Sequence, residues 1–348
     1  MMTCNKNFVS IIIPCRNEEK YINTVLEEIL SQDFPKDYLE VLVIDGRSED
    51  NTRNIIRDYV KKYPIFKLVD NQKKTVPFAL NLGIKKSKGD YILRMDAHAK
   101  YPNNYISKLL YWLDKLDADN VGAVWITHPS SDKIMAQAVS HVLSHPFGVG
   151  NAYFRIGTTK PKEVDTVPFG CYRREVFDKI GLFDEELIRN QDDEFNARLK
   201  RNGGKIYLIP EVQVVYYARA SFNKLRKMYY QYGYFKPLVN IKLGKPANLR
   251  QFVPVLFILS LIFFLTLSIF VRGSVWIFFL ILCCYLVLNI YFSVKIAFGS
   301  RKILCLYIPI AFAITHFSYG IAYFAGLLDF YILKKHLRGK RKDVSLSR

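Results

Sequence analysis

Acidic side chains are scarce in this chain. Its 348 residues include 31 Asp and Glu against 50 Lys and Arg, which gives a formal net charge of +19. A protein this basic is suited to nucleic acid, to a membrane surface or to phosphate-bearing small molecules. Much of the positive charge flanks an apolar C-terminal region, which favours a membrane and phosphate-bearing partners over nucleic acid.

The chain also lacks the cysteine patterns of a metal finger or a disulfide scaffold. Its six cysteines include an adjacent pair inside an apolar run, and none has zinc-site spacing. We expect reduced, mostly structural thiols in a protein that faces the cytosol. No signal peptide is visible either, because the apolar run 8–13 is too short and ends at Pro14, which predicts a strand.

Charged residues are sparse between 252 and 333. The runs 252–271 and 275–294 are each long enough to cross a hydrocarbon core of roughly 30 Å. The run 303–333 is too long for one upright span and too short for two. Runs of this length with few charges disfavour the alternative of a buried helical core, so we expect a multi-pass protein of the bacterial inner membrane or a plasma membrane.

Basic residues around these runs predict the topology. The loop 295–302 and the tail 334–342 are both basic, and the positive-inside rule places both in the cytosol. A hairpin over 252–294 satisfies the loop, whereas a full third crossing would put the tail outside. We therefore expect part of 303–333 to lie in the membrane interface, to re-enter, or to form two short crossings.

The N-terminal part alternates between strand and helix patterns, which predicts an α/β fold with a mostly parallel sheet. A helix is also expected at 190–202, a strand at 212–217 and a basic, tyrosine-rich helix or helix pair at 221–243. The strands are expected at 8–13, 40–44, 66–69, 90–95 and 121–126, and the helices between them include 75–87 and 103–116. The predicted domains are 1–245, cytosolic and catalytic, 246–333, in the membrane, and 334–348, a basic tail.

Polar side chains follow three of the predicted strands. In open parallel sheets, ligands gather at the carboxyl ends of the strands. We therefore expect donor-binding residues in the segments that follow the first, second and fourth strands. These candidates are Pro14, Arg16, Asn17, Glu18, Asp45, Ser48, Arg94 and Asp96.

Two acids after the second strand are expected to differ in role. Asp45 ends the strand, where a carboxylate can accept from a uracil ring N–H or from ribose hydroxyls. A helix is expected at 50–62, and Ser48 or Asp50 would cap its start better than Asp45 would. We assign ligand binding to Asp45 and capping to Asp50.

Asp96 and His98 form the most informative pair of the sequence. They lie two residues apart after the strand at 90–95, and alternate side chains of an extended segment point the same way. A carboxylate and an imidazole can share a divalent cation, and imidazole suits Mn²⁺ better than Mg²⁺. An isolated Asp-x-His triplet is more often exposed to solvent than bound to a metal. Here the position of the triplet at the end of a strand favours a metal site.

Three adjacent acids open the predicted helix at 190–202. Glu194 and Arg198 have the spacing of a surface charge pair, but a pair does not need Asp192 and Asp193 as well. A carboxylate at a helix N-terminus is expected to keep a low pKa and can accept a proton from an attacking hydroxyl. Asp192 is our candidate for that base.

The segment 219–236 is both basic and aromatic. One interpretation is an amphipathic helix on the membrane surface just before the first span. Contacts of Gln231 and Lys236 with phosphate or sugar are an equal alternative.

Taken together, these motifs resemble family 2 glycosyltransferases. The resemblance covers roughly residues 8–240, in the order expected for that family. The segments 9–19 (VSIIIPCRNEE) and 43–50 (VIDGRSED) resemble its nucleotide-sugar-binding start. The segment 88–98 (KGDYILRMDAH) resembles its Asp-x-Asp region, 170–184 its acceptor-side segment and 191–198 (QDDEFNAR) its catalytic helix. The Asp-Ala-His variant and the trailing apolar runs look most like the succinoglycan and exopolysaccharide branch.

The resemblance implies a GT-A fold and inverting transfer from a nucleotide diphosphate sugar. In that pattern Asp192 falls on the general base, Asp45 on the carboxylate that reads the nucleotide base, and Asp96 with His98 on the metal site. The sequence departs from the pattern at Gln191, where Glu is usual, and at His98, where a second Asp is usual. Residues 231–235 match only part of the Gln-x-x-Arg-Trp motif of processive synthases, which favours the addition of one sugar.

The predicted protein is a membrane-bound hexosyltransferase of cell-surface polysaccharide synthesis. Its expected donor is a nucleotide diphosphate sugar, with a UDP-sugar favoured, and its expected acceptor is lipid-linked or a glycan. Its expected cofactor is a divalent cation, with Mn²⁺ favoured and Mg²⁺ possible. The alternatives are a polyprenyl-monophosphate glycosyltransferase and a non-catalytic membrane scaffold with a degenerate nucleotide domain. Net charge alone would suggest a nucleic-acid-binding protein, and we expect no nucleic-acid partner.

Overall fold

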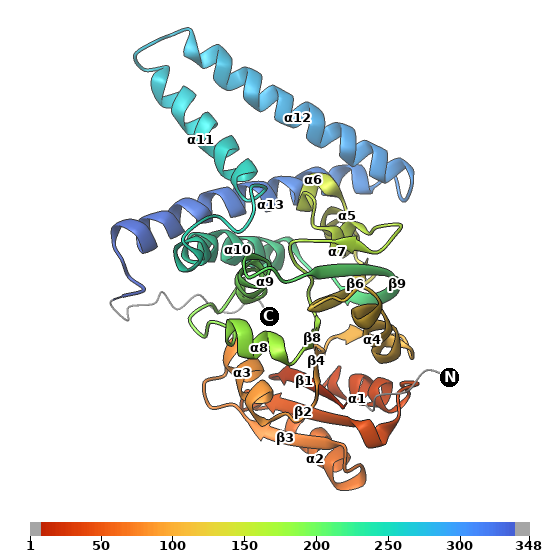
Figure 1. Cartoon of the computed structure of the whole chain (residues 1–348). Coiled ribbons are helices and arrows are strands. Elements are labelled where there is room, and N and C mark those ends of the chain that lie inside the picture. The colour runs from red at the N-terminus through yellow and green to blue at the C-terminus, as the bar shows by residue number, and fades with distance from the viewer. Residues whose placement is uncertain (1–7, 338–348) are drawn as a thin grey trace. The chain divides into compact units, whose positions relative to one another are not determined.

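The structure is a computed structural model that describes residues 8–337 (Figure 1). The chain divides into two compact units, one from the Met1–Ile126 and Tyr153–Tyr216 stretches and the other from Thr127–Ala152 and Tyr217–Arg348. Residues 127–152 and 217–245, which the sequence assigned to the catalytic domain, thus belong to the second unit. The domain limits at 245 and 333 remain predictions, and most of the basic tail lies outside the described residues.

The first unit contains a mixed sheet with the strand order β3-β2-β1-β4-β8-β6-β9-β5, to which β7 adds beside β9. Strands β1 to β4 are mutually parallel, as the alternation of strands and helices predicts. They are β1 (Val9–Cys15), β2 (Leu39–Asp45), β3 (Phe66–Asp70) and β4 (Tyr91–Arg94). All residues of β1, β2 and β4 are buried, which is typical of parallel strands covered on both faces.

The remaining strands make the other half of the sheet antiparallel. β8 (Cys171–Arg173) runs antiparallel to both β4 and β6 (Asn120–His128), so β6 is parallel to β4. β9 (Ile206–Tyr217) begins earlier than the predicted strand at 212–217 and pairs with β5 (Ala99–Lys100) and β7 (Lys162–Glu163). The sequence missed β5, β7 and β8 because two or three residues cannot display a periodic pattern.

Helices of this unit begin and end close to where the apolar periodicity predicts. Their apolar faces are buried against the sheet, as with Ile22, Val25, Leu26 and Ile29 of the first helix. The bounds are η1 (Lys36–Tyr38), α1 (Ile22–Leu30), α2 (Thr52–Lys62), α3 (Val76–Lys86), α4 (Tyr105–Lys115), α7 (Tyr153–Ile156), α8 (Glu175–Ile180) and α9 (Gln191–Arg201). After α9, Gly203 has φ +81°, which confirms the predicted glycine stop.

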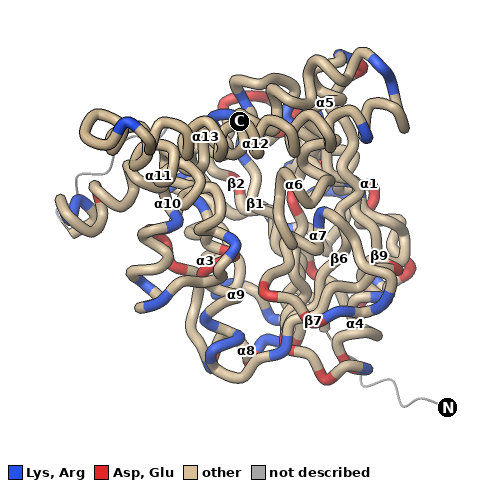
Figure 2. The backbone as a smooth tube through the Cα atoms, turned by 90° about the horizontal axis from the view of Figure 1, so that it is seen from above, with Lys and Arg blue, Asp and Glu red and all other residues tan. Residues whose placement is uncertain are grey.

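The second unit consists of helices. They are α5 (Ile134–Leu143), α6 (Pro146–Val149), α10 (Phe222–Leu243), α11 (Phe252–Leu267), α12 (Ser274–Phe298) and α13 (Leu304–Leu327), and a π-helical turn, η2 (Leu328–Ile332), extends α13. α10 is one helix, so the alternative of a helix pair is wrong. Figure 2 shows α11, α12 and α13 traced almost entirely by uncharged residues.

The predicted membrane spans differ in extent from the helices of the structure. α11 has 16 residues and ends at Leu267, because the chain turns before α12 begins, so the predicted span 252–271 is too long. The run 303–333 is one continuous helix with its π turn, which rules out two short crossings. In the described chain, Ser274–Phe298 and Leu304–Ile332 are long and apolar enough to cross a membrane, judged by length and composition alone.

Candidate active site

The loops after β1 and β2 are held together at the carboxyl edge of the sheet. The Asn17 amide donates to Ser48 Oγ at 2.9 Å, and Asn17 Oδ1 accepts from the Glu49 amide at 2.9 Å. The Glu18 amide donates to Thr52 Oγ1 at 2.8 Å. The structure therefore brings together two of the predicted donor-binding segments, as expected for the ends of neighbouring parallel strands.

Asp45 is fully buried beneath these loops. Its carboxylate accepts from the Ser48 amide at 3.2 Å and lies 2.7 Å from Arg53 Nη1. Arg53 also pairs with Asp70 at 2.8 Å, so one guanidinium joins the ends of β2 and β3. The sequence analysis missed Arg53 because it is the second residue of a surface helix, with no motif around it.

Asp50 lies one residue before Asn51, the N-cap of α2, so it is not the N-cap residue itself, but its side chain accepts from an amide at the start of this helix. It accepts from the amide of Thr52, the first residue of α2, at 3.0 Å and from the Glu19 amide at 3.2 Å. The desolvation of Asp50 would raise its pKa, but these hydrogen bonds together outweigh it and lower the pKa. Asp50 is thereby explained as a residue that shapes the loop.

Arg94 connects the end of β4 with the start of α9. Its Nε donates to Asp96 Oδ1 at 3.1 Å and its Nη1 donates to Asp192 Oδ1 at 2.6 Å. The guanidinium carbon also lies 5.6 Å from the centre of the Phe169 ring. Two carboxylates that are far apart in the sequence, the candidate metal ligand and the candidate base, thus share one buried cation.

Burial sets the pKa of Asp192. Desolvation raises the pKa of this carboxyl above its usual range, and the nearby Arg94 guanidinium opposes the rise without cancelling it. The expectation of a low pKa from the helix N-terminus is therefore wrong, because loss of solvent outweighs the helix dipole and the ion pair. Glu194 instead forms the predicted pair with Arg198, at 2.7 Å, and plays a structural role.

The segment from Asp96 to His98 is held by its neighbours. The Asp96 amide donates to the Tyr101 hydroxyl at 2.7 Å, and His98 Nδ1 lies 3.6 Å from Glu18 Oε1. Between residues 8 and 337, no group of three or more His, Cys, Asp or Glu side chains is arranged to hold a metal ion. A cation bound by Asp96 and His98 would therefore take further oxygens from a ligand such as a diphosphate or from water.

The other predicted site residues fall into two groups. Pro14 is buried in β1, and Arg16 is partly exposed with its Nη2 3.6 Å from Glu49. Gln231 and Lys236 are buried in α10, which belongs to the second unit. Their contact with donor or acceptor stays a prediction.

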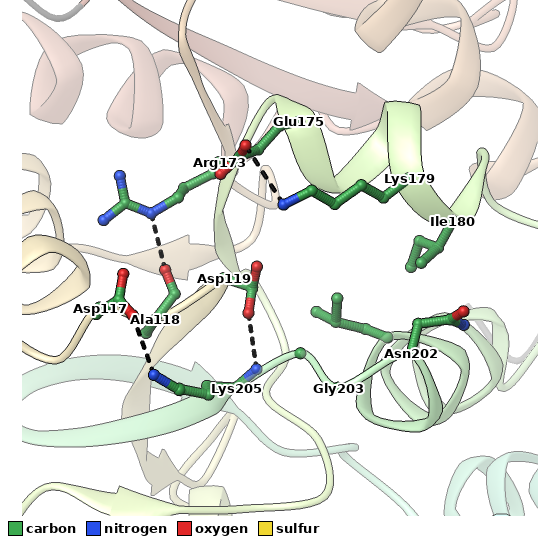
Figure 3. A pocket seen from close by; sticks show the side chains of 12 residues that line it. Asp117, Ala118, Asp119, Arg173, Glu175, Lys179, Ile180, Asn202, Gly203 and Lys205 are labelled. Carbon is green, nitrogen blue, oxygen red and sulfur yellow. Dashed lines mark hydrogen bonds and ion pairs between the residues drawn. The ribbon is translucent and has the colours of Figure 1, made fainter.

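A cavity of about 320 Å³ lies elsewhere in the first unit (Figure 3). Arg173 on the wall of the cavity is paired in the sheet with Tyr91, the first residue of β4, whereas Asp96 lies beyond the last residue of that strand. The cavity is therefore at the opposite end of the strand from Asp96. Asp117 pairs with Lys205 at 3.0 Å, and Glu175 pairs with Lys179 at 3.4 Å. These charges largely balance one another, so the cavity offers no clear binding chemistry.

The cysteines have the roles that the sequence predicts. Those of the described chain are free thiols, two of them buried in the first unit at Cys15 and Cys171. Burial raises the pKa of the Cys171 thiol to about 12, which keeps it protonated and unreactive. Cys4 lies outside the described residues.

Comparisons with known proteins identify the family of this chain. Residues 10–181 match the model of glycosyl transferase family 2. A curated relative from Methanococcus voltae, dolichyl N-acetyl-alpha-D-glucosaminyl phosphate 3-beta-D-2,3-diacetamido-2,3-dideoxy-beta-D-glucuronosyltransferase, is 32% identical over 74% of this chain and 80% of its own length. The succinoglycan biosynthesis protein ExoA of Rhizobium meliloti is 29% identical over 70% of this chain and 74% of its own.

Solved structures show the same fold. The mannosyltransferase PcManGT from Pyrobaculum calidifontis, in complex with GDP-Man and Mn²⁺, has a TM-score of 0.59 at 19% identity, over 93% of this chain and 88% of that one. TarS residues 1–349 of S. aureus, in complex with UDP, has a TM-score of 0.50 at 16% identity, over 96% and 92% of the two chains. At these identities the likeness concerns the fold alone.

Proposed function

The chain belongs to glycosyl transferase family 2 and is a glycosyltransferase, and from this premise we propose that it transfers a sugar from a UDP-sugar to a lipid-linked acceptor in cell-surface polysaccharide synthesis. The observation that carries the proposal is the buried Arg94 bridge between Asp96 and Asp192. It puts a candidate proton acceptor beside the candidate diphosphate site. The names of the M. voltae and R. meliloti relatives, with their lipid-linked and polysaccharide substrates, support the acceptor class.

The reaction proposed is a single displacement. The acceptor hydroxyl oxygen forms a bond to the anomeric carbon, the bond from that carbon to the diphosphate breaks, and the diphosphate leaves with the electron pair. Asp192 takes the proton of the hydroxyl as the new bond forms. One displacement inverts the anomeric centre and needs one carboxylate, whereas inverting hydrolases use two.

Arg94 has a positioning role in this scheme. It fixes Asp192 Oδ1 at 2.6 Å and so holds the carboxylate in place. An Arg in this position is also close to the charge that develops on a departing diphosphate. The donor-binding residues proposed around it are Pro14, Arg16, Asn17, Glu18, Ser48 and Asp96. Asp45 is fully buried, so we propose that it acts on the donor through the loop that it holds.

A divalent cation fits the donor set of this site. Asp96 supplies a carboxylate and His98 an imidazole, a mixture that Mn²⁺ accepts more readily than Mg²⁺. When bound, such a cation would act as a Lewis acid that stabilises the charge of the leaving diphosphate. The neighbouring PcManGT structure contains Mn²⁺, which supports the choice of metal class.

We also propose how the second unit meets the membrane, with α11 and α12 inserted as a hairpin and α13 in the plane of the interface. One face of α13 is buried: Leu304, Ile308 and Phe312 share a cluster with α5 and α10. α10 carries the exposed Lys224 and Lys227, which hydrocarbon would not accept. A helix covered by such neighbours along its length cannot also be surrounded by lipid.

The other face of α13 supports this arrangement. It carries an exposed apolar stripe of helical spacing, formed by Leu306, Ile310, Ile321, Leu328 and Ile332. Only the middle of the helix is covered on that face, where Phe317 packs against Phe257 of α11 and Tyr285 of α12. Figure 1 shows α5 and α10 along one side of α13 and the α11–α12 hairpin on the other.

The function is tested with full-length protein in detergent, given radiolabelled UDP-sugars and polyprenyl-phosphate or glycolipid acceptors. Wild type should label an extended glycolipid, and Asp192→Asn should lose on the order of 10²–10⁴-fold in rate. Asp193→Asn is the matched control and should keep activity. Label on the polyprenyl phosphate itself would favour the polyprenyl-monophosphate alternative, and unchanged activity of Asp192→Asn would remove Asp192 as the base.

A further inference from the structure

Arg155 lies in an aromatic box in the first unit. It belongs to α7 and is 8% exposed. Its guanidinium carbon is 4.9 Å from the ring centre of Trp125, 5.2 Å from that of Tyr216 and 5.4 Å from that of Phe154. Trp125 and Tyr216 stack at 4.4 Å, so the box is one packed group that holds the guanidinium in place.

Two donors of this box have no acceptor. Arg155 Nη1 and Trp125 Nε1 are both buried without a hydrogen-bond partner in the described chain. Aromatic faces attract a guanidinium, but they accept no strong hydrogen bond and carry no negative charge. Arg94 is the contrast, because two carboxylates neutralise it.

An unpaired buried charge is costly unless an anion joins it. Folding therefore leaves a cation and a second donor ready for an acceptor that the protein does not supply. The chemistry that fits is an anion with several acceptor oxygens, since a guanidinium fork matches phosphate in a bidentate way.

The box adjoins the candidate active site through two routes. Tyr216 is paired in the sheet with Ala99, the residue after His98. Trp125 packs against Phe169 at 4.9 Å, and Phe169 in turn lies under Arg94 at 5.6 Å. The anion site is therefore close to the reacting centre.

The order of strands places the box on the acceptor side. Asp45 lies at the end of β2, and Asp96 follows β4. In the strand order of the sheet, β4 lies between β2 on one side and β6 and β9 on the other. The box is built on β6 and β9, so it lies across the centre from the proposed nucleotide loops. With strands about 4.8 Å apart, β6 is roughly 10 Å from β4, about the span of one sugar together with its phosphate.

We propose that Arg155 and Trp125 bind the phosphate through which the acceptor sugar is joined to its lipid. This inference rests on the proposed function and names the group of the acceptor that the enzyme holds. The guanidinium and the indole N–H donate to phosphate oxygens, and the aromatic rings give the attached sugar an apolar face. The attacking hydroxyl would then be held near Asp192 by a contact one sugar away.

The test is equilibrium dialysis of the full-length protein in detergent with farnesyl monophosphate, farnesol or inorganic phosphate. Wild type should bind farnesyl monophosphate more tightly than farnesol. Arg155→Met should bind it at least about tenfold more weakly, and Arg155→Lys should be intermediate. Arg57→Met, which removes an exposed charge from α2, is the matched control and should bind like wild type.

Binding of UDP is measured on the same variants. UDP affinity should be unchanged in Arg155→Met, which also shows that the variant is folded. A parallel loss of UDP affinity in a folded variant would assign Arg155 to the donor and overturn the proposal, as would wild-type affinity of Arg155→Met for farnesyl monophosphate. Inorganic phosphate that competes as well as farnesyl monophosphate would overturn the assignment to a lipid acceptor.

A second variant covers the case in which Arg155→Met does not fold. Trp125→Phe keeps a ring and removes one donor, so farnesyl monophosphate should bind a few-fold more weakly while UDP binding stays constant. Unchanged binding of both ligands would contradict the proposed pair of donors. Because only binding is measured, these outcomes do not depend on whether Asp192 is the base or on which sugar is transferred.

Discussion

At the scale of single residues, the candidate active site is organised by a charge arrangement that joins two segments, the end of β4 and the start of α9. Arg94 lies between the carboxylates of Asp96 and Asp192, and removing the arginine would leave the buried Asp96 carboxylate close to the partly buried Asp192 carboxylate. Two carboxylates held close together in a poorly solvated site repel each other, so keeping both ionised costs more free energy than it would in water. Arg94 therefore opposes the rise in the pKa of Asp192 that desolvation causes.

The raised pKa of Asp192 predicts the acid side of the activity profile. As pH falls through that pKa, the carboxylate takes up a proton and can no longer act as a base, so the rate falls at a higher pH than an ordinary Asp would give. The profile of kcat/KM against pH measures this limb. Arg94→Lys, which weakens the ion pair, should move the limb further up, whereas Asp193→Asn should leave it in place.

The identity of the cation is predicted from His98. Wild type should be more active with Mn²⁺ than with Mg²⁺, and His98→Asp should shift the preference toward Mg²⁺, because a carboxylate is a harder ligand than an imidazole. Activity with each metal at matched free concentration measures the ratio. A wild type that prefers Mg²⁺ outright would remove His98 as a ligand and leave Asp96 to hold the metal without it.

At the scale of elements, glycines let helices of the second unit approach one another closely. A Cβ at Gly326 of α13 would lie 2.2 Å from the carbonyl oxygen of Tyr234 in α10, and one at Gly233 would lie 2.3 Å from that of Tyr319. Backbone atoms cannot move aside as a flexible side chain can. These two contacts fix α10 against α13 near the C-terminal end of the apolar helix.

Gly326→Val is therefore expected to destabilise the second unit by about 1–3 kcal/mol through overpacking. The temperature at which the detergent-solubilised protein loses its monodisperse peak on size exclusion should fall. Gly273→Ala is the matched control, because a Cβ added at Gly273 would have no atom within 4 Å and the φ of this residue is −63°. Equal midpoints for the two variants would contradict the close approach.

At the scale of the whole molecule, the proposed arrangement in the membrane has one inserted hairpin. With α13 in the interface, both of its ends lie on the cytosolic side of the membrane, and the hairpin tip at Gly273 lies on the other. A topology reporter fused after Arg348 should therefore read as cytosolic, and one inserted at Gly273 as external. An external reading at Arg348 would mean that α13 crosses the membrane.

Much of the fold follows from local patterns, whereas the pairing of distant strands does not. The four parallel strands and their helices are visible because each buried strand is a short apolar run and each helix has one apolar face. β8 is invisible in sequence and yet joins the two halves of the sheet. The three residues of β8 form a strand because of their hydrogen bonds to the neighbouring strands and their burial in the fold.

The candidate site divides in the same way. Residue types at the strand ends singled out Asp45, Asp96 and His98, and a run of acids at the start of a predicted helix singled out Asp192. Their partners came only from the structure, since Arg53 and Arg155 are part of no motif and are defined by what they contact. The low pKa expected for Asp192 failed for the same reason, because burial is a property of the surrounding fold.

The sequence by itself determined the glycosyltransferase class, the α/β fold and the apolar C-terminal helices, because each depends on residue types at short spacings. The tertiary structure alone decided that Arg94 joins Asp96 to Asp192, that α13 is one helix with a covered and an exposed face, and that Arg155 is a buried cation without an anion in the described chain. Charge pairing and burial are set by segments far apart in the chain. They become defined only when folding removes water and brings those segments into contact.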